Sequence, residues 1–415
     1  MRRLERAFYL DKSKCEGCTN CMRKCPTEAI RIIDEKAVIN DDKCIHCGEC
    51  IRVCPYNAYN SVTDKIADIN KNKFSIAIPS TAVYGQFHIG TEICNIHKAL
   101  LSMGFDYVYD ESWGADLVSQ AVKNRVRKTN DNRPVINSNC PAVLRLIKVK
   151  YPSLMENIIQ LQSPMEISAL LARKKAKDIF GKNDEDVEVF YISPCPAKSI
   201  RVYSPIVLGP SKIDKVISLK EIYGDLIREM KMHHEICYSN PSVKGLKWSL
   251  SGGQCEAAEI EHSIAVSGIE NVLNILEEIE MGKLNHIDFV ELMSCNESCV
   301  GGPFNFENPF VAKNNINYIM KNTDDTNILI DDIDRFEEFD KLGYFEQEIT
   351  LGLKNTEALN IKAGIERLEK VNKMVKIIPK IDCGSCGSPT CRALAEDIVD
   401  GINTIESCVI LKIKK

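Results

Sequence analysis

No apolar run in the sequence is long enough to cross a membrane, which takes about 20 consecutive apolar residues. The chain also lacks an excess of one charge: 53 Lys and Arg stand against 58 Asp and Glu, which leaves a net charge of −5. We therefore expect neither a membrane nor a nucleic acid as a partner. The basic start at residues 1–6 is not followed by an apolar segment of signal-peptide length, so we expect a cytoplasmic location.

Cysteine, in contrast, is abundant. The chain has 19 cysteines in 415 residues, and without a secretion signal this number favours metal ligation over disulfides. The seven histidines show no ligand spacing, so the spacing of the cysteines must indicate which metal is bound. The length predicts two or three domains, and a hydrophobic content of 44% is enough for a large core.

Two cysteine runs of identical spacing lie near the N-terminus. Each reads Cys-x2-Cys-x2-Cys-x3-Cys-Pro, the run of bacterial two-cluster ferredoxins, in which the fourth cysteine ligates the other cluster. We therefore assign one [4Fe–4S] cluster to Cys15, Cys18, Cys21 and Cys54, and a second to Cys44, Cys47, Cys50 and Cys25. Between the two cysteine runs, the apolar stretches 30–33 and 37–39 predict the strands of a hairpin. Zinc is the alternative metal, but zinc sites rarely duplicate this spacing.

The central part of the chain alternates apolar strands with helical stretches from Phe74 onward. Cys295 and Cys299 lie between a predicted strand and a glycine-rich turn, while Cys140 and Cys195 each follow an apolar run and precede a proline. Repeated strand, cysteine loop and helix predict an α/β domain with its site at the carboxyl ends of strands. Together the four thiolates could hold one cubane, and a pair of buried structural thiols is the alternative for Cys295 and Cys299.

These loops resemble the three signature loops of [FeFe] hydrogenases, which read Thr-Ser-Cys-Cys-Pro, Met-Pro-Cys-x-x-Lys and Glu-x-Met-x-Cys-x3-Cys. The matching positions are Ser138, Cys140 and Pro141 in the first loop, Pro194, Cys195 and Lys198 in the second, and Glu291, Met293, Cys295 and Cys299 in the third. Flanking stretches at 79–80, 114–117 and 251–258 share the likeness, which runs to about residue 311.

The resemblance implies an H-cluster. Cys140, Cys195, Cys295 and Cys299 would hold its cubane, and Cys299 would also bridge to a diiron unit that carries carbonyl, cyanide and a bridging dithiolate amine. Lys198 would donate to an iron-bound cyanide, a role that suits a desolvated cation beside an anionic ligand. A solvated surface lysine is the alternative.

Three further residues belong to the motifs around this site. Ser80 and Met293 match the family there. Cys255 replaces a methionine beside the family's active site, and it could either line the cavity or belong to the core.

The chain also departs from the family's pattern. Asn139 stands where the family has the cysteine that passes protons to the bridging amine, and an amide cannot exchange a proton usefully near neutral pH. Arg201 replaces a glutamate of the usual proton path, Ser193 replaces a methionine, and the third loop is shortened at residues 301–303. The ligands are retained while the known proton relay is not. These changes resemble the divergent, sensory branches of the family.

A third cysteine group lies near the C-terminus and consists of Cys383, Cys386, Cys391 and Cys408. It resembles the small four-cysteine [4Fe–4S] domain of electron-transport complexes and sensory hydrogenases. A helix over 392–406 would return Cys408 to the cysteine loop. Zinc is again the alternative.

We therefore expect an α/β protein with three domains: a ferredoxin-like α+β domain over residues 1–62, a central α/β hydrogenase domain over 73–350, and a small iron–sulfur domain over 376–415. The expected function is reversible oxidation of H2 to protons at an H-cluster, at low turnover and with a regulatory role. Four [4Fe–4S] clusters would relay electrons to a redox protein such as ferredoxin or to a signalling protein. The alternative is an electron-transfer or scaffold protein that keeps the cubanes and lacks the diiron unit.

Overall fold

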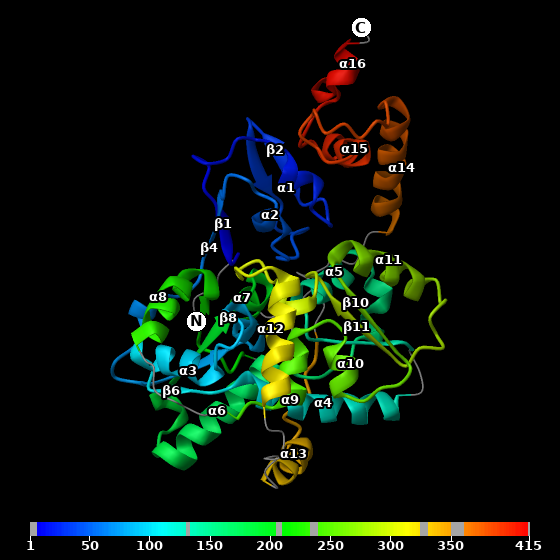
Figure 1. Cartoon of the computed structure of the whole chain (residues 1–415). Coiled ribbons are helices and arrows are strands. Elements are labelled where there is room, and N and C mark those ends of the chain that lie inside the picture. Colours follow the sequence, from blue (N-terminus) through cyan, green and yellow to red (C-terminus); the bar gives the residue numbers. More distant parts are fainter. Residues whose placement is uncertain are drawn as a thin grey trace. The chain divides into compact units, whose positions relative to one another are not determined.

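The computed structural model describes residues 6–129, 133–204, 210–232, 240–323, 331–349 and 361–413. The chain divides into two compact units, each of which has its own core (Figure 1). Unit 1 comprises the described parts of Met1–Ala7, Ile45–Cys47 and Ser61–Thr350. Unit 2 comprises the described parts of Phe8–Cys44, Gly48–Asn60 and Leu351–Lys415, so it joins the N-terminal cysteine runs to the C-terminal cysteine group.

Unit 1 is built around two parallel sheets. The larger has the order β6-β5-β8-β9, with strands Tyr107–Val108, Phe74–Pro79, Val187–Ser193 and Lys215–Ser218. The smaller has the order β10-β11-β7, with strands Ser263–Ser267, Phe289–Met293 and Val135–Ile136. All of these ladders are parallel, which places the carboxyl ends of the strands in each sheet at one edge. The α/β class that the sequence predicts is confirmed.

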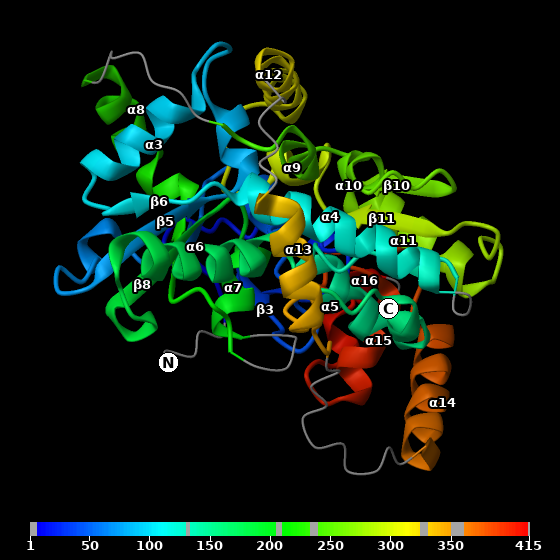
Figure 2. The ribbon, with the colours of Figure 1, turned by 90° about the horizontal axis from the view of Figure 1, so that it is seen from below.

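Helices cover both faces of the larger sheet, as Figure 2 shows for α6 on one side and α3 and α8 on the other. The alternation of side chains along the strands explains this arrangement. Ile76 and Tyr191 pack with α4 and α6, whereas Ala77 and Phe190 pack with α3 and α8. Full burial of a large apolar side chain such as Ile76 or Phe190 contributes about 1.5–3 kcal/mol to stability. The helices of unit 1 are α3 Ile93–Ser102, α4 Glu111–Lys128, α5 Pro141–Lys150, α6 Pro164–Phe180, α7 Pro196–Tyr203, α8 Leu219–Met232, α9 Val243–Leu246, α10 Gly253–Ala257, α11 Ile269–Glu280, α12 Pro309–Asn322 and α13 Asp331–Lys341.

Unit 2 contains two small two-stranded sheets and short helices. Strands β2 (Ile30–Ile33) and β3 (Lys36–Ile39) form the predicted antiparallel hairpin, and Asp34 and Glu35 make its turn with positive φ angles. The other elements are β1 Phe8–Leu10, β4 Tyr59–Ser61, α1 Asn20–Arg23, α2 Glu49–Arg52, α14 Ile361–Ile377, α15 Cys391–Val399 and α16 Val409–Ile413.

The last long helix is shorter than the sequence predicts. The sequence predicts a helix over 392–406, but α15 ends at Val399 and Gly401 follows with a φ of 73°. This left-handed glycine ends the helix. A single turn at Ile405–Ser407 then leads to Cys408. Among the described residues, no helix has both the length and the apolar character that a membrane span requires.

Candidate functional site

Three strands of unit 1 each lead into a cysteine loop. Strand β7 is followed by Cys140, the N-cap of α5, and β8 is followed by Cys195, the N-cap of α7. In both helices a proline occupies the first position, where its missing N–H costs nothing. Strand β11 ends at Met293 and leads directly to Cys295 and Cys299.

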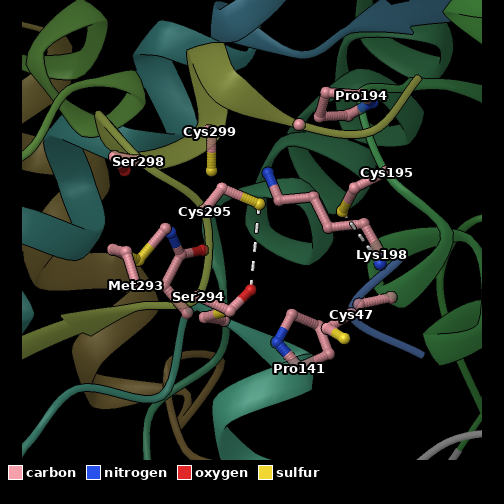
Figure 3. Close-up of a pocket in the computed structure, with 14 residues that line it drawn as sticks. Cys47, Pro141, Pro194, Cys195, Lys198, Met293, Ser294, Cys295, Ser298 and Cys299 are labelled. Carbon is pink, nitrogen blue, oxygen red and sulfur yellow. Dashed lines mark hydrogen bonds between the residues drawn. The ribbon is translucent and has the colours of Figure 1, made fainter. Parts of the chain in front are cut away.

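The three loops meet at one pocket, drawn in Figure 3. Cys140, Cys195, Cys295 and Cys299 all line it, together with Lys198. Gly302 allows the third loop to approach the second, because a Cβ there would lie 2.4 Å from the Pro194 carbonyl oxygen. These four cysteines are spread over 159 positions of the chain, from 140 to 299, and the structure brings them to one pocket.

The four cysteines are not in disulfides; Cys140 and Cys295 are buried, and Cys195 and Cys299 are partly buried. Burial raises the pKa of Cys299 to about 12 and also raises the pKa of Cys195. Among the described residues, no three His, Cys, Asp or Glu side chains are arranged to hold a single metal ion. Four thiols lining one pocket match the number of ligands that a cubane takes.

Lys198 is buried and held in a polar network. Its ammonium nitrogen lies 2.8 Å from the Tyr191 hydroxyl and 3.4 Å from Glu111 Oε1, and the Tyr191 hydroxyl donates to the same Glu111 oxygen at 2.8 Å. Burial, the largest single effect, would lower the pKa of Lys198, but the interactions with Glu111, Tyr191 and Cys299 together outweigh it and raise the pKa well above its ordinary value. The solvated-lysine alternative is thereby removed, since Lys198 is only 4% exposed.

Glu111 and Tyr191 are site residues that the sequence analysis missed. Glu111 is the first residue of α4, whose N-cap Asp110 accepts from the Ser112 amide at 2.8 Å. Its second carboxylate oxygen accepts from the Thr81 amide at 2.8 Å. The only sequence signal was an acidic residue just before the Gly114–Leu117 stretch.

Two buried polar atoms that face this pocket have no hydrogen-bond partner among the described residues. They are Asn139 Oδ1 and Ser298 Oγ, and both side chains line the pocket. Buried polar groups are normally satisfied, so such atoms point to a further group in the pocket. A cubane with an attached polar unit fits this donor set of four thiols, one ammonium, one amide and one hydroxyl.

Of the three other predicted site residues, Met293 lines the pocket, whereas Ser80 and Cys255 do not. Met293 lines the pocket, and its sulfur accepts from Gln254 Nε2 at 3.4 Å. Ser80 is fully buried just after β5 but does not line the pocket. Cys255 is buried on α10, and it too is absent from the lining; burial and the nearby Glu291 carboxylate raise its pKa to about 12.

Cys47, one of the assigned N-terminal ligands, also lines this pocket and belongs to unit 1. Ile45, two residues before Cys47, packs in the same core cluster as Cys140. The remaining N-terminal cysteines lie in unit 2, where the two runs have equivalent backbones: the Ala29 amide donates to Cys25 Sγ at 3.2 Å, and the Ala58 amide donates to Cys54 Sγ at 3.4 Å. Amides that point at thiolate sulfurs are typical of iron–sulfur ligands, whose charge they stabilise.

The C-terminal cysteines also gather at one place. Cys383, Cys386, Cys391 and Cys408 line a second pocket, within unit 2. Asp382 closes the loop, because its carboxylate accepts from the Cys391 amide at 2.6 Å while its own amide donates to Cys391 Sγ at 3.4 Å.

Glu291 lies on β11, the strand that leads into the third cysteine loop, and its side chain binds the start of α10. Its buried carboxylate accepts from the amides of Gly252, Gln254 and Cys255. Burial raises the pKa of Glu291 to about 7, although these hydrogen bonds partly oppose the shift.

This raised pKa predicts a specific pH dependence of stability. The folded protein binds the Glu291 proton more tightly than the unfolded chain does. The contribution of this proton to the free energy of unfolding is therefore complete below pH 4.5 and is lost as the pH rises through 7. The loss amounts to about 3 kcal/mol at 1.36 kcal/mol per unit. Urea unfolding between pH 5 and 8 should therefore show a shallower pH dependence for Glu291→Gln than for wild type. The exposed Glu278→Gln is the control, and equal slopes for Glu291→Gln and wild type would contradict the assignment.

Three protein-family models match separate parts of the chain. The model described as "Iron only hydrogenase large subunit, C-terminal domain" matches residues 73–303, more than half of the chain. A "4Fe-4S dicluster domain" matches residues 7–55, and an Fe-S cluster model matches residues 378–410.

Two curated relatives are hydrogenases. The chain is 24% identical to "Iron hydrogenase 1" of Clostridium pasteurianum over 255 residues, which cover 50% of this chain and 44% of that protein. It is 26% identical to "NADP-reducing hydrogenase subunit HndD" of Solidesulfovibrio fructosivorans over 165 residues, 37% of this chain and 26% of that subunit. The chain thus matches less than half the length of these relatives.

Solved structures show the same fold. The HydA(deltaEFG) structure of an [FeFe]-hydrogenase, titled for stepwise H-cluster assembly, aligns with a TM-score of 0.53 at 16% identity over 69% of this chain and 97% of that one. Apo HydA1 from Chlamydomonas reinhardtii aligns with a TM-score of 0.52 at 16% identity over 70% and 97%. These likenesses show the fold, and the family model that matches more than half of the chain agrees with the resemblance seen in the cysteine loops: the chain belongs to the iron-only, or [FeFe], hydrogenase family.

Proposed function

We propose that this protein catalyses the reversible reaction H2 ⇌ 2H⁺ + 2e⁻ at an H-cluster, slowly, and that it serves a regulatory or sensory role. The observation that carries the proposal is the pocket in which Cys140, Cys195, Cys295 and Cys299 meet around Lys198. A diiron unit bound beside the cubane would supply the cleavage and formation of H2. The chain's own residues would anchor the cluster, exclude water and move protons and electrons.

Lys198 is suited to hold an anionic ligand there. A buried ammonium needs compensating charge, and Glu111 together with Tyr191 fixes its position at the pocket wall. Asn139 Oδ1 and Ser298 Oγ supply polar atoms that have no hydrogen-bond partner among the described residues. These features support binding of a polar diiron unit next to the cubane.

Low turnover is proposed because two proton-carrying groups of the family are replaced. Asn139 lines the pocket but its amide does not ionise. Arg201 is fully buried, and Nη2 donates to Gln347 Oε1 at 2.9 Å. Burial lowers the pKa of Arg201, yet a guanidinium stays charged at physiological pH and cannot replace a glutamate as a relay.

Electrons would leave the central cubane through the N-terminal clusters. Cys47, a ligand assigned to the second N-terminal cluster, lines the same pocket as the four central cysteines, and this supports the route. A redox protein such as a ferredoxin, or a signalling protein, would exchange electrons with the chain.

A second function, electron transfer without hydrogen chemistry, is supported by one observation. Lys198 is already paired with Glu111 and Tyr191, so its burial does not require a cyanide ligand. In this case the protein would keep its cubanes and lack the diiron unit. Infrared spectroscopy of the matured protein separates the two functions, and hydrogen-dependent reduction of a viologen tests the reaction itself.

The number of clusters can be tested without the diiron unit. Sixteen assigned ligands imply four cubanes, or about sixteen irons per chain. Anaerobic reconstitution without maturation enzymes, followed by iron and sulfide assays, should reach that plateau. Quadruple replacement of Cys383, Cys386, Cys391 and Cys408 by serine should lower it by about four irons. A wild-type plateau near eight irons would contradict the central and C-terminal assignments.

A further inference from the structure

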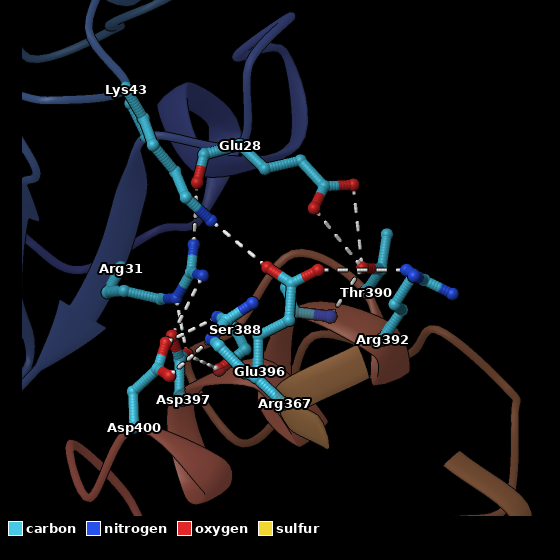
Figure 4. Close-up of polar contacts among 12 residues, drawn as sticks. Glu28, Arg31, Lys43, Arg367, Ser388, Thr390, Arg392, Glu396, Asp397 and Asp400 are labelled. Atoms are coloured by element: carbon cyan, nitrogen blue, oxygen red, sulfur yellow. Dashed lines mark hydrogen bonds and ion pairs between the residues drawn. The ribbon is translucent and has the colours of Figure 1, made fainter. Parts of the chain in front are cut away.

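The N-terminal and C-terminal iron–sulfur segments contact each other within unit 2 (Figure 4). Arg31 on β2 makes a fork with Asp397 on α15, with its Nε 2.6 Å from Oδ2 and its Nη2 3.0 Å from Oδ1. The Ser388 hydroxyl also donates to Asp397, at 3.0 Å. Side-chain exposures of 13% and 8% show that this pair is largely withdrawn from water. Bidentate pairing in such a setting is geometrically specific.

Further polar contacts extend the same interface. The Lys43 ammonium lies 3.1 Å from Glu396 Oε2, and the Thr390 hydroxyl lies 3.4 Å from Glu28 Oε1. The N-terminal side contributes two cations to carboxylates of α15. The charges of the two segments are therefore complementary at this contact.

The backbones also pair. The Ile32 amide donates to the Gly387 carbonyl at 2.8 Å, which covers the free edge of the β2–β3 hairpin. Gly387 has a φ of +82°, and a Cβ there would lie only 2.1 Å from the Ile32 carbonyl oxygen. Only glycine permits this approach. The contact thus uses the loop between Cys386 and Cys391.

The contact also brings cluster-binding loops together. Arg23 Nη2 donates to the Cys383 carbonyl at 2.9 Å, and the Cβ position of Gly384 lies 3.1 Å from Met22 Cε. Met22 and Arg23 directly follow Cys21 on α1. The Met22 side chain beside Gly384 and the hydrogen bond from Arg23 to Cys383 therefore connect a ligand loop of the first N-terminal cluster to a ligand loop of the C-terminal cluster.

We propose that the C-terminal cluster is docked on α1 and β2 as the outer end of a linear electron chain. Electrons would pass singly between the cluster of Cys383, Cys386, Cys391 and Cys408 and that of Cys15, Cys18, Cys21 and Cys54. In each step one reduced cubane loses an electron and its neighbour gains it. The second N-terminal cluster would be the next member of this electron chain. This inference rests on the cluster assignments of the proposed function but not on its hydrogen chemistry.

The docked C-terminal segment would determine where a redox partner binds. Since the C-terminal segment occupies α1 and the β2 edge, a one-electron protein donor or acceptor would meet the C-terminal segment and not this face of the ferredoxin-like segment. The Arg31–Asp397 ion pair would keep the C-terminal segment docked on the N-terminal segment, so that electrons can pass between their clusters.

Zero-length carbodiimide cross-linking of the full-length reconstituted protein tests the docking. Lys43 and Glu396 should form a cross-linked peptide, and Lys313 with Glu297, 2.8 Å apart in unit 1, provides an internal standard. Arg31→Glu should reduce the Lys43–Glu396 product roughly tenfold or more, because it sets two carboxylates against each other. The double variant Arg31→Glu with Asp397→Arg should restore it. Arg367→Glu, which breaks a pair inside the C-terminal segment with Asp400, is the control and should leave it unchanged.

Paramagnetic resonance of the same proteins, reduced and without a diiron unit, tests the electron chain. Magnetic interaction between the C-terminal cubane and its neighbour should be present in wild type, lost in Arg31→Glu and recovered in the double variant. Absence of both the cross-link and the interaction in fully reconstituted wild type would overturn the proposal. These measurements need no infrared signal from carbonyl or cyanide, so failure of the hydrogenase function would leave them unchanged.

Discussion

Asn139→Cys should raise the rate of hydrogen evolution by about 10²-fold, at the lower end of the range for restoring a general acid–base group. Asn139 lines the pocket at the position of the family's proton-passing thiol, and a thiol with a pKa of about 8.5 can exchange protons where an amide cannot. The gain should stay incomplete because Arg201 leaves a second gap in the usual path. The measurement is hydrogen evolution from reduced viologen, with infrared occupancy of the diiron site matched between proteins.

Asn139→Ala is the control, since it removes the amide without supplying a thiol, and it should not raise the rate. Fast wild-type turnover at matched occupancy would mean that another proton route exists. A fully occupied Asn139→Cys protein with no gain would show that proton supply does not limit the reaction.

Glu111→Gln should destabilise the protein that lacks the diiron unit by about 3–5 kcal/mol. The reason is that the substitution leaves the buried Lys198 ammonium without its carboxylate partner, with only the Tyr191 hydroxyl within hydrogen-bond distance among the described residues. If Lys198 donates to an anionic ligand in the matured protein, that ligand supplies the missing charge. The cost of Glu111→Gln should then be clearly smaller after maturation. Urea unfolding of wild type and variant, each with and without the diiron unit, measures both values.

Glu338→Gln provides the matched control. Its partner Lys174 lies 2.7 Å away in an exposed pair, for which a loss of less than about 1 kcal/mol is expected. An equal cost of Glu111→Gln before and after maturation would show that Lys198 does not pair with a bound anion.

The cysteine loops were predictable because ligand spacing is a local property of the sequence. The runs around Cys15 and Cys44 carry their own geometry, and each central cysteine follows a buried strand of a parallel sheet. Parallel strands bring such loops to one edge whatever their separation along the chain. The same reasoning gave the α/β class and the β2–β3 hairpin, both of which the structure confirms.

Contacts between distant side chains were not predictable in this way. Glu111 meets Lys198 across 87 positions and Arg31 meets Asp397 across 366, and neither pair belongs to a motif. Cys255 shows the opposite case: the motif placed it near the site, while packing turns it toward the Ile264 carbonyl, 3.9 Å away. Such orientations follow from how helices pack on the sheets and leave no periodic signal in the sequence.

The ligand and catalytic roles of individual residues stay predictions, and one measurement tests the central one directly. The infrared spectrum of the anaerobically matured protein should show bands of iron-bound carbonyl and cyanide, and Lys198→Ala should shift the cyanide bands more than the carbonyl bands. Wild-type protein loaded with about sixteen irons but without such bands after maturation would contradict the account, and would identify the chain as a carrier of cubanes alone.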